Sequence, residues 1–196
     1  MRVAAPHLIL ASASPRRRQL LTNAGFDFAV FLPSVKEVFP SNLTLREITT
    51  WNALRKGLAV ARAHPDAVIL AADTLVGRDH EVIGKPANLK EARRTLQRLS
   101  GRTHTVVSGV FLGHLARGRT ETFTVLSEVV FKKWGDREIE DYLTKIDPLD
   151  KAGAYAAQGR GRTIVRRIVG SRSNVIGLPL EKIRTALARF GVRRRD

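Results

Sequence analysis

Short apolar runs along the chain are separated by segments that carry turn and helix signals. The first run, HLIL at residues 7–10, is typical of a strand and leads through the turn SASP into RRRQLLTNAG. Ser14 can cap a helix whose first residue is Pro15, where the missing N–H does no harm. Gly25 can end that helix in the left-handed conformation. FDFAVF, at residues 26–31, alternates weakly and predicts a second strand.

The next segment combines a helix start with a buried strand. Thr44 and Glu47 form a T-x-x-E capping box, which predicts a helix to about His64, stopped by Pro65. AVILAA, at residues 67–72, is continuously apolar. Such a run is typical of a strand that is buried on both faces.

The centre of the chain again predicts a helix followed by strands. A loop at residues 84–86 precedes Asn88 and Glu91, which offer a cap for a helix that ends near Gly101. Two β-rich segments follow and are predicted to be neighbours in one sheet: HTVVSGVFLGHL at 104–115 and TFTVLSEVVF at 122–131.

In the last third of the chain, the pattern of residues predicts two helices, a loop and a strand. Asp136 starts a helix with three apolar side chains on one face: Ile139, Tyr142 and Leu143. Residues 148–161 are rich in Gly and Ala and predict a loop, and TIVRRIV at 163–169 predicts a strand. Pro179 starts a final helix that Gly191 ends.

Strands thus alternate with helices over the whole chain, without repeats or low-complexity segments. This order predicts an α/β fold, with a mixed sheet and flanking helices, in a single domain over residues 1–196. A central cleft between two lobes is compatible with the pattern.

Composition narrows the class of protein. The chain has 196 residues, of which 43% are hydrophobic and 27% charged, as in an ordinary globular protein. No apolar run approaches the ~20 residues that span a bilayer, so no membrane partner is expected. The absence of a secretion signal predicts a cytoplasmic location. Cysteine is absent, which excludes disulfides, thiolate metal sites and a cysteine nucleophile.

The formal net charge of +16 indicates an anionic partner. Nucleic acid and phosphorylated small molecules both qualify, and an arginine-rich surface can also reflect a GC-rich genome. The Arg193–Arg195 run adds to the case for a basic nucleic-acid-binding module. Aromatic residues make up only 6%, and no stacking platform is visible, which argues against nucleic acid.

Arg16, Arg17 and Arg18 follow the predicted strand and turn directly. The N-terminus of a helix at such a turn binds phosphate readily, and arginine adds bidentate donors. Consecutive helical residues point about 100° apart, so we expect one or two of these side chains to face a ligand. The alternative is that the three arginines lie on the solvated surface and bind no ligand.

Other candidate residues are weaker when taken singly. Asp73 and Thr74 come directly after the buried run, where open α/β sheets place ligand crevices, although a turn-forming Asp is as good an interpretation. Glu37, Lys56 and Lys85 would each be read as structural on their own.

The segment 146–161 combines small residues, which allow close backbone approach, with Gln158, whose amide could read a base edge. A flexible loop is the alternative. The sequence contains no Walker loop, Rossmann fingerprint or hydrolase elbow.

Six motifs occur along the chain in this order: LILASASPRR, AADTLV, GKP, LSGRTHTVVSGV, DPLDKAGAYAAQGRG and SNVIGLPL. Together they closely resemble the Maf family, the septum-formation-inhibitor-like nucleoside triphosphate pyrophosphatases. That family is similar in fold to the inosine triphosphate pyrophosphatases. The resemblance extends from about Leu8 to Phe190, and the ordered set is specific although each motif alone is weak.

The resemblance implies hydrolysis of a nucleotide between its α and β phosphates, which gives a monophosphate and pyrophosphate. It implies that Asp73 is the proton acceptor and that Glu37 and Asp73 hold a divalent cation, Mg²⁺ or Mn²⁺. Lys56 and Lys85 would hold phosphates as catalytic lysines. Substrate-binding roles carry over to five residues: Ser12, Arg16, Arg17, Thr74 and Gln158.

Three of these positions look diagnostic for the substrate. The dTTP/UTP branch of the family has the counterparts of Arg16, Thr74 and Gln158, whereas the branch similar to 7-methyl-GTP enzymes typically has a bulky aromatic, Gln and Glu. The resemblance therefore implies dTTP and UTP, with modified pyrimidine nucleotides left open.

The chain departs from the family pattern at three positions. Lys36 stands where relatives often have a second acid, and Ser108 where Thr is frequent. Gly57 replaces the usual Ala after Lys56, which should weaken that helix by up to ~1 kcal/mol.

Family analogy further implies a homodimer and a role in cell-division arrest or nucleotide-pool cleansing. A non-catalytic regulator of cell division stays open as an alternative, beside the nucleic-acid-binding module.

Overall fold

The computed structural model describes residues 7–79 and 81–195, so residues 1–6, 80 and 196 of the predicted domain lie outside the described part. The chain divides into two compact units, each built from segments that are distant in sequence. Unit 1 comprises Met1–Thr74, Ser108–Val125 and Gly177–Asp196; unit 2 comprises Leu75–Val107 and Leu126–Ile176. Neither unit is therefore one continuous stretch of chain.

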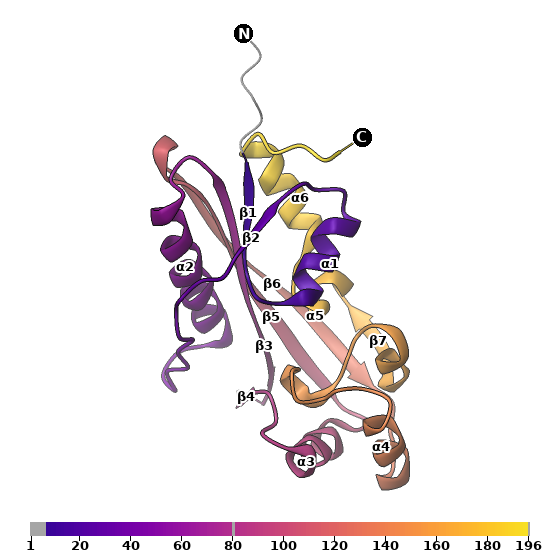
Figure 1. The fold of residues 1–196 in the computed structure, drawn as a ribbon. Coiled ribbons are helices and arrows are strands. Elements are labelled where there is room, and N and C mark those ends of the chain that lie inside the picture. The colour runs from indigo at the N-terminus through magenta and orange to yellow at the C-terminus, as the bar shows by residue number, and fades with distance from the viewer. Residues whose placement is uncertain (1–6, 80, 196) are drawn as a thin grey trace. The chain divides into compact units, whose positions relative to one another are not determined.

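Seven strands among the described residues form one sheet, in the order β2-β1-β3-β5-β6-β7, with β4 paired to β3 off this path (Figure 1). β1 is parallel to both β2 and β3, whereas β4 is antiparallel to β3 and β7 is antiparallel to β6. The strands are β1 (Leu8–Ala11), β2 (Ala29–Phe31), β3 (Val68–Arg78), β4 (Glu81–Ile83), β5 (Thr103–His114), β6 (Arg119–Phe131) and β7 (Val165–Val169). The sheet is mixed, which confirms the predicted α/β class.

Helices belong to both units. Unit 1 holds α1 (Pro15–Asn23), α2 (Leu45–Ala63), the 3₁₀ helix η1 (Leu115–Arg117) and α6 (Leu180–Arg189). Unit 2 holds α3 (Leu89–Leu99), α4 (Asp136–Leu143), η2 (Ala152–Ala154), η3 (Gly159–Ile164) and α5 (Arg172–Ile176). Within the described residues, no helix is both long enough and apolar enough to cross a bilayer.

Two helix caps read from the sequence are confirmed by side-chain hydrogen bonds, whereas the Ser14 side chain forms no capping hydrogen bond at the start of α1. The Thr44 hydroxyl accepts from the Glu47 N–H, and the Glu47 carboxylate accepts from the Thr44 N–H, so the capping box starts α2. The Asn88 side chain accepts from the N–H of Glu91 at the start of α3. Gly25 follows α1 with φ +81°, in the left-handed region.

Strand β3 is longer than its apolar run indicated. It extends from Val68 to Arg78, so the prediction that Asp73 and Thr74 follow the end of a strand is wrong. A ladder is built from backbone groups, and a polar pair does not end it. Asp73 and Thr74 are neighbours inside the strand and therefore point to opposite faces of the sheet.

Short elements account for the other differences. Only Ala29–Phe31 of the predicted 26–31 strand is in the sheet, and β7 starts at Val165 because the preceding residues form η3. The sequence did not predict β4 or α5. These elements have three and five residues, which is too short to show a periodicity.

The core of unit 1 contains buried apolar residues of α2 and β1 together with Phe111 of β5. A Cβ atom on Gly57 would lie 2.0 Å from Cδ1 of Phe111, so the ring fills the space that an alanine methyl would need. The glycine is therefore part of the packing, whereas the sequence alone indicated only a weaker helix.

The core of unit 2 contains an aromatic group made of His104, Phe131 and Tyr155. Their ring centroids are 4.7 to 5.3 Å apart, in edge-on pairs. Nε2 of His104 and the hydroxyl of Tyr155 share a hydrogen bond of 3.0 Å. The ring of Tyr155 is buried in this core by packing, and the segment that carries Gln158 follows it directly in the sequence.

Candidate active site

In unit 1, one ammonium group lies between two carboxylates. Nζ of Lys56 is 2.5 Å from Oε1 of Glu37 and 2.6 Å from Oδ1 of Asp73. Lys56 comes from α2 and Asp73 from the middle of β3, while Glu37 lies in the loop before α2. The side chains of Asp73 and Lys56 are only 4% and 10% exposed, whereas that of Glu37 is 42% exposed. Three predicted site residues thus form one cluster that opens to solvent at Glu37.

Asn52 belongs to this cluster, although the sequence did not single it out. Its Nδ2 donates to Oδ2 of Asp73 at 3.3 Å and to the carbonyl of Val38 at 3.0 Å, and its Oδ1 accepts from the Val38 N–H. Asn52 therefore fixes the chain beside Glu37 against α2. A signal was available, because Asn52 lies one helical turn before Lys56 and so on the same face.

The position of Asp73 changes its acidity. Burial raises the pKa of the Asp73 carboxyl above its ordinary value, against the opposing effects of Lys56 and Arg17. Glu37 adds to the rise through its own negative charge. A carboxylate with a raised pKa is a better proton acceptor than an exposed aspartate.

Arg17 anchors the other face of β3. Its Nε donates to the carbonyl of Gly177 at 2.8 Å. Its Nη1 donates to the hydroxyl of Ser12 at 3.3 Å, and its Nη2 donates to the hydroxyl of Thr74 at 3.2 Å. Thr74 in turn shares a 2.8 Å hydrogen bond with Ser108. Burial lowers the pKa of Arg17, and the carboxylates of the cluster oppose that shift.

Among the three arginines, Arg17 thus points inward, Arg16 is half-buried and Arg18 is exposed. Ser12 is buried and also accepts from the N–H of Ser14 at 3.2 Å, which shapes the turn before α1. The structure therefore brings Ser12, Arg17 and Thr74 together.

The two remaining predicted residues, Lys85 and Gln158, belong to unit 2. The Lys85 side chain is exposed, and that of Gln158 is half-exposed. Their segments are joined by the backbone, since the N–H of Gly153 donates to the carbonyl of Gly84 at 3.1 Å. Lys85 and Gln158 are thus presented by two connected segments of one unit.

The donor set in unit 1 fits a hard divalent cation. Glu37 and Asp73 offer carboxylate oxygens, the ligands that Mg²⁺ and Mn²⁺ prefer, and Mg²⁺ commonly takes one or two carboxylates plus substrate phosphates. No group of three or more His, Asp or Glu side chains is suited to hold a metal within residues 7–79 and 81–195. A cation held by these two carboxylates would complete its coordination with water and substrate phosphate oxygens.

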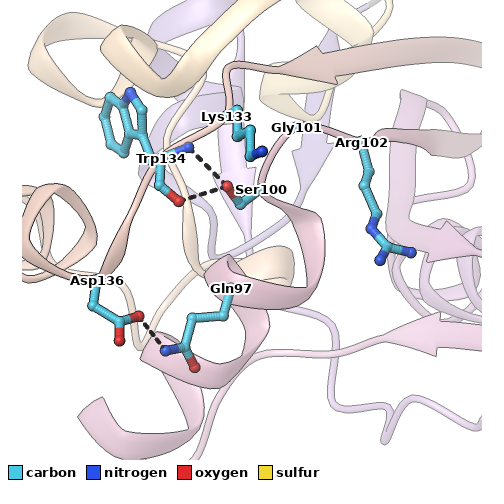
Figure 2. A pocket seen from close by; sticks show the side chains of 7 residues that line it. All are labelled: Gln97, Ser100, Gly101, Arg102, Lys133, Trp134 and Asp136. Carbon is cyan, nitrogen blue, oxygen red and sulfur yellow. Dashed lines mark hydrogen bonds between the residues drawn. The ribbon is translucent and has the colours of Figure 1, made fainter.

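A separate cavity of about 540 Å³ lies in unit 2 beside the end of α3 (Figure 2). Its wall includes the exposed cations Arg102 and Lys133, and the Ser100 hydroxyl bonds both backbone groups of Trp134. No predicted site residue lines it: the lining consists of Gln97, Ser100, Gly101, Arg102, Lys133, Trp134 and Asp136.

Comparisons with solved structures support the fold. The chain is similar to a HAM1 protein from Coxiella burnetii, with a TM-score of 0.53 at 15% identity, over 94% of this chain and 99% of that chain. At this identity the likeness concerns the fold alone. It supports the predicted α/β fold.

Comparisons of sequence are more specific. The chain is 42% identical over 185 residues to a dTTP/UTP pyrophosphatase of Bacillus pumilus, covering 94% of this chain and 97% of the relative. A dTTP/UTP pyrophosphatase of Bacillus anthracis is 40% identical, with coverage of 94% and 96%. The model of the family described as Maf-like protein matches residues 7–190. The predicted resemblance is confirmed, and the chain belongs to the Maf family.

Proposed function

We propose that this chain hydrolyses dTTP and UTP between the α and β phosphates and releases a monophosphate and pyrophosphate. Relatives that are 40–42% identical over 94% of the chain carry the name dTTP/UTP pyrophosphatase. The observation that carries the proposal is the cluster in which Lys56 lies between Glu37 and Asp73. It offers a proton acceptor and a phosphate-binding cation within one hydrogen bond of each other.

Asp73 is the proposed base. Each of its oxygens accepts one hydrogen bond, from Lys56 or from Asn52, and a carboxylate oxygen has room for a second donor. Asp73 takes a proton from a water molecule whose oxygen bonds the α phosphorus. The bond from that phosphorus to the bridging oxygen breaks, and pyrophosphate leaves with the electron pair.

Cationic side chains offset the charge of the triphosphate. An ammonium has three N–H donors, and Lys56 uses two of them on Glu37 and Asp73, which leaves one for a phosphate oxygen. Arg17 holds the turn before α1, where free backbone N–H groups favour phosphate. Arg16 and Lys85 are proposed to bind the remaining phosphate oxygens.

A divalent cation, Mg²⁺ or Mn²⁺, is proposed at Glu37 and Asp73. When bound, it would neutralise developing charge on the phosphate oxygens. The Lys56 ammonium lies between the same two carboxylates, so cation and ammonium compete for them.

Gln158 is proposed to read the pyrimidine. Its amide presents one acceptor and two N–H donors, which match the N3–H and carbonyl groups of uracil or thymine. Thr74 and Arg16 complete the pattern of the dTTP/UTP branch. A cytoplasmic location, a single functional domain and a homodimer stay predictions.

The decisive experiment measures pyrophosphate release across a nucleotide panel with Mg²⁺ or Mn²⁺, for the wild type and Asp73→Asn. Asparagine keeps the shape but removes the charge and basicity, so turnover should fall at least ~100-fold. Asp66→Asn is the matched control, because Asp66 is an exposed acid of the same unit. Turnover of Asp73→Asn within a few fold of the control would refute the proposed base.

A further inference from the structure

A single hydroxyl group closes the segment that carries Gln158. Oη of Tyr142, on α4, accepts from the N–H of Ala156 at 3.2 Å and donates to the carbonyl of Gly161 at 2.7 Å. Both partners are backbone groups, one at each end of the segment Ala156–Gly161, which we call the Gln158 loop. Tyr142 is only 2% exposed, so water does not compete readily for these hydrogen bonds.

The two ends of the Gln158 loop also meet directly. A Cβ atom on Gly161 would lie 2.4 Å from the Cβ of Ala156 and 2.8 Å from its carbonyl oxygen, so only glycine fits there. Inside the loop, the N–H of Gly161 donates to the carbonyl of Gln158 at 3.1 Å. The loop is therefore a closed structure whose backbone is defined on both sides.

The surroundings hold the base of the loop and leave its tip free. Tyr155 and Ala157 are buried, whereas Gly159 and Arg160 are exposed. No described residue forms a hydrogen bond with the side-chain amide of Gln158, although its backbone is held. An amide with a fixed backbone and no internal partner is suited to bind a ligand.

We propose that Tyr142 is a positioning residue that sets pyrimidine selectivity by closing the Gln158 loop. The inference rests on the proposed function, in which Gln158 reads the base. A side chain reaches a base edge with the right donor and acceptor only if its backbone is in place. Opening the loop therefore weakens the distinction between uracil and cytosine, whose edges present opposite donors and acceptors.

Tyr142→Phe tests the proposal, because it removes only the hydroxyl and keeps the ring packed on Trp134, 5.3 Å away between centroids. We expect the UTP-over-CTP ratio of kcat/KM to fall about tenfold, mostly through KM, as for loss of one well-made hydrogen bond. Gln158→Ala should lower the ratio similarly. The double variant should be no worse than Gln158→Ala, because both changes remove the same interaction.

Tyr155→Phe is the matched control. It also removes a buried tyrosine hydroxyl, but that group is bonded to His104 and not to the loop ends. It should keep the UTP-over-CTP ratio. Gly161→Ala is a second variant, because its methyl group would push the loop ends apart while Tyr142 stays intact. It should lower the ratio as Tyr142→Phe does.

Hydrogen exchange separates this proposal from the proposed function. Tyr142→Phe should speed exchange of the Ala156 amide by up to about tenfold, whether or not the protein is a pyrophosphatase. Unchanged exchange, or an unchanged ratio in Tyr142→Phe beside a lowered ratio in Gln158→Ala, overturns the role of Tyr142. An equal fall of the ratio in Tyr155→Phe does so too, because it points to general destabilisation. A wild type that releases no pyrophosphate from any nucleotide instead overturns the proposed function.

Discussion

The predicted site residues of the two units are held in opposite ways. In unit 1, charged side chains hold one another: Lys56 bridges Glu37 and Asp73, and Arg17 binds Ser12 and Thr74. In unit 2, backbone contacts hold the segments of Lys85 and Gln158, whose side chains form no hydrogen bonds with other described residues. The predicted site side chains are thus paired with one another in unit 1, whereas those of Lys85 and Gln158 in unit 2 are available to a ligand.

The difference follows from the cost of burying charge. A buried carboxylate without a partner is costly, so Asp73 needs Lys56 and Asn52 even before substrate binds. An exposed ammonium or amide is solvated by water and needs no internal partner. The proposed catalytic charges of unit 1 are therefore tied to stability, while the proposed recognition groups of unit 2 can be changed with little effect on folding.

Removal of the Lys56 ammonium should destabilise unit 1 strongly. Lys56→Met keeps a long side chain but leaves Asp73 buried without its cation, which should lower the free energy of unfolding by about 3 kcal/mol. Urea denaturation measures this change. Lys85→Met is the matched control, because it removes an exposed lysine of unit 2 and should change stability by less than about 0.5 kcal/mol. Equal losses in the two variants would remove the contrast between the units.

The packing of α2 against Phe111 also ties unit 1 to stability. Gly57→Ala places a methyl group where the Phe111 ring lies. Gly113 limits the ring on another side, because a Cβ atom there would lie 2.5 Å from Cζ of Phe111. Overpacking of this kind should lower the free energy of unfolding by about 2 kcal/mol, although alanine is the better helix former.

Phe111→Leu in the Gly57→Ala background checks this explanation. The smaller side chain makes room for the methyl group, so the double variant should be more stable than the sum of the two single changes predicts. Urea denaturation of all four proteins completes the cycle. Strict additivity would mean that Phe111 is not the reason for Gly57.

The sequence predicted those parts of the fold that short-range interactions specify. The Thr44–Glu47 box and the Asn88 cap involve residues three positions apart, so their signals are complete within the sequence. The extent of β3 beyond Ala72 depends on pairing with other strands, and the local pattern at Asp73 resembled a strand end. The packing role of Gly57 could not be predicted for the same reason, because it depends on Phe111, which lies far along the chain.

Most members of the candidate site could be predicted from the sequence, but their contacts could not. The resemblance supplied Glu37, Lys56 and Asp73, but no spacing indicated that the ammonium lies between the two acids. Nor could the sequence show which arginine of the run points inward, since this depends on the position of Gly177, 160 residues away from Arg17. Asn52 was missed because its partner carboxylate comes from a different element.

A weaker effect on stability, a dependence on pH, arises in unit 2 at His104. Burial and the nearby charge of Arg78 lower the pKa of His104 to about 4. Between about pH 4 and pH 6.5, the His104 imidazole is therefore protonated in the unfolded chain and neutral in the folded protein. The contribution of His104 to the free energy of unfolding is fully present above pH 6.5 and is lost as the pH falls from 6.5 to about 4.

Between about pH 6.5 and about pH 5.5, the loss from His104 should be about 1 kcal/mol. Urea denaturation at the two pH values measures it, and His104→Gln, which cannot titrate there, should flatten the dependence. Asp73 in unit 1 contributes with the opposite sign, because its raised pKa favours the folded state at low pH. A pH dependence that is unchanged in His104→Gln would assign the loss to other groups and show that the His104–Tyr155 contact tolerates a charge.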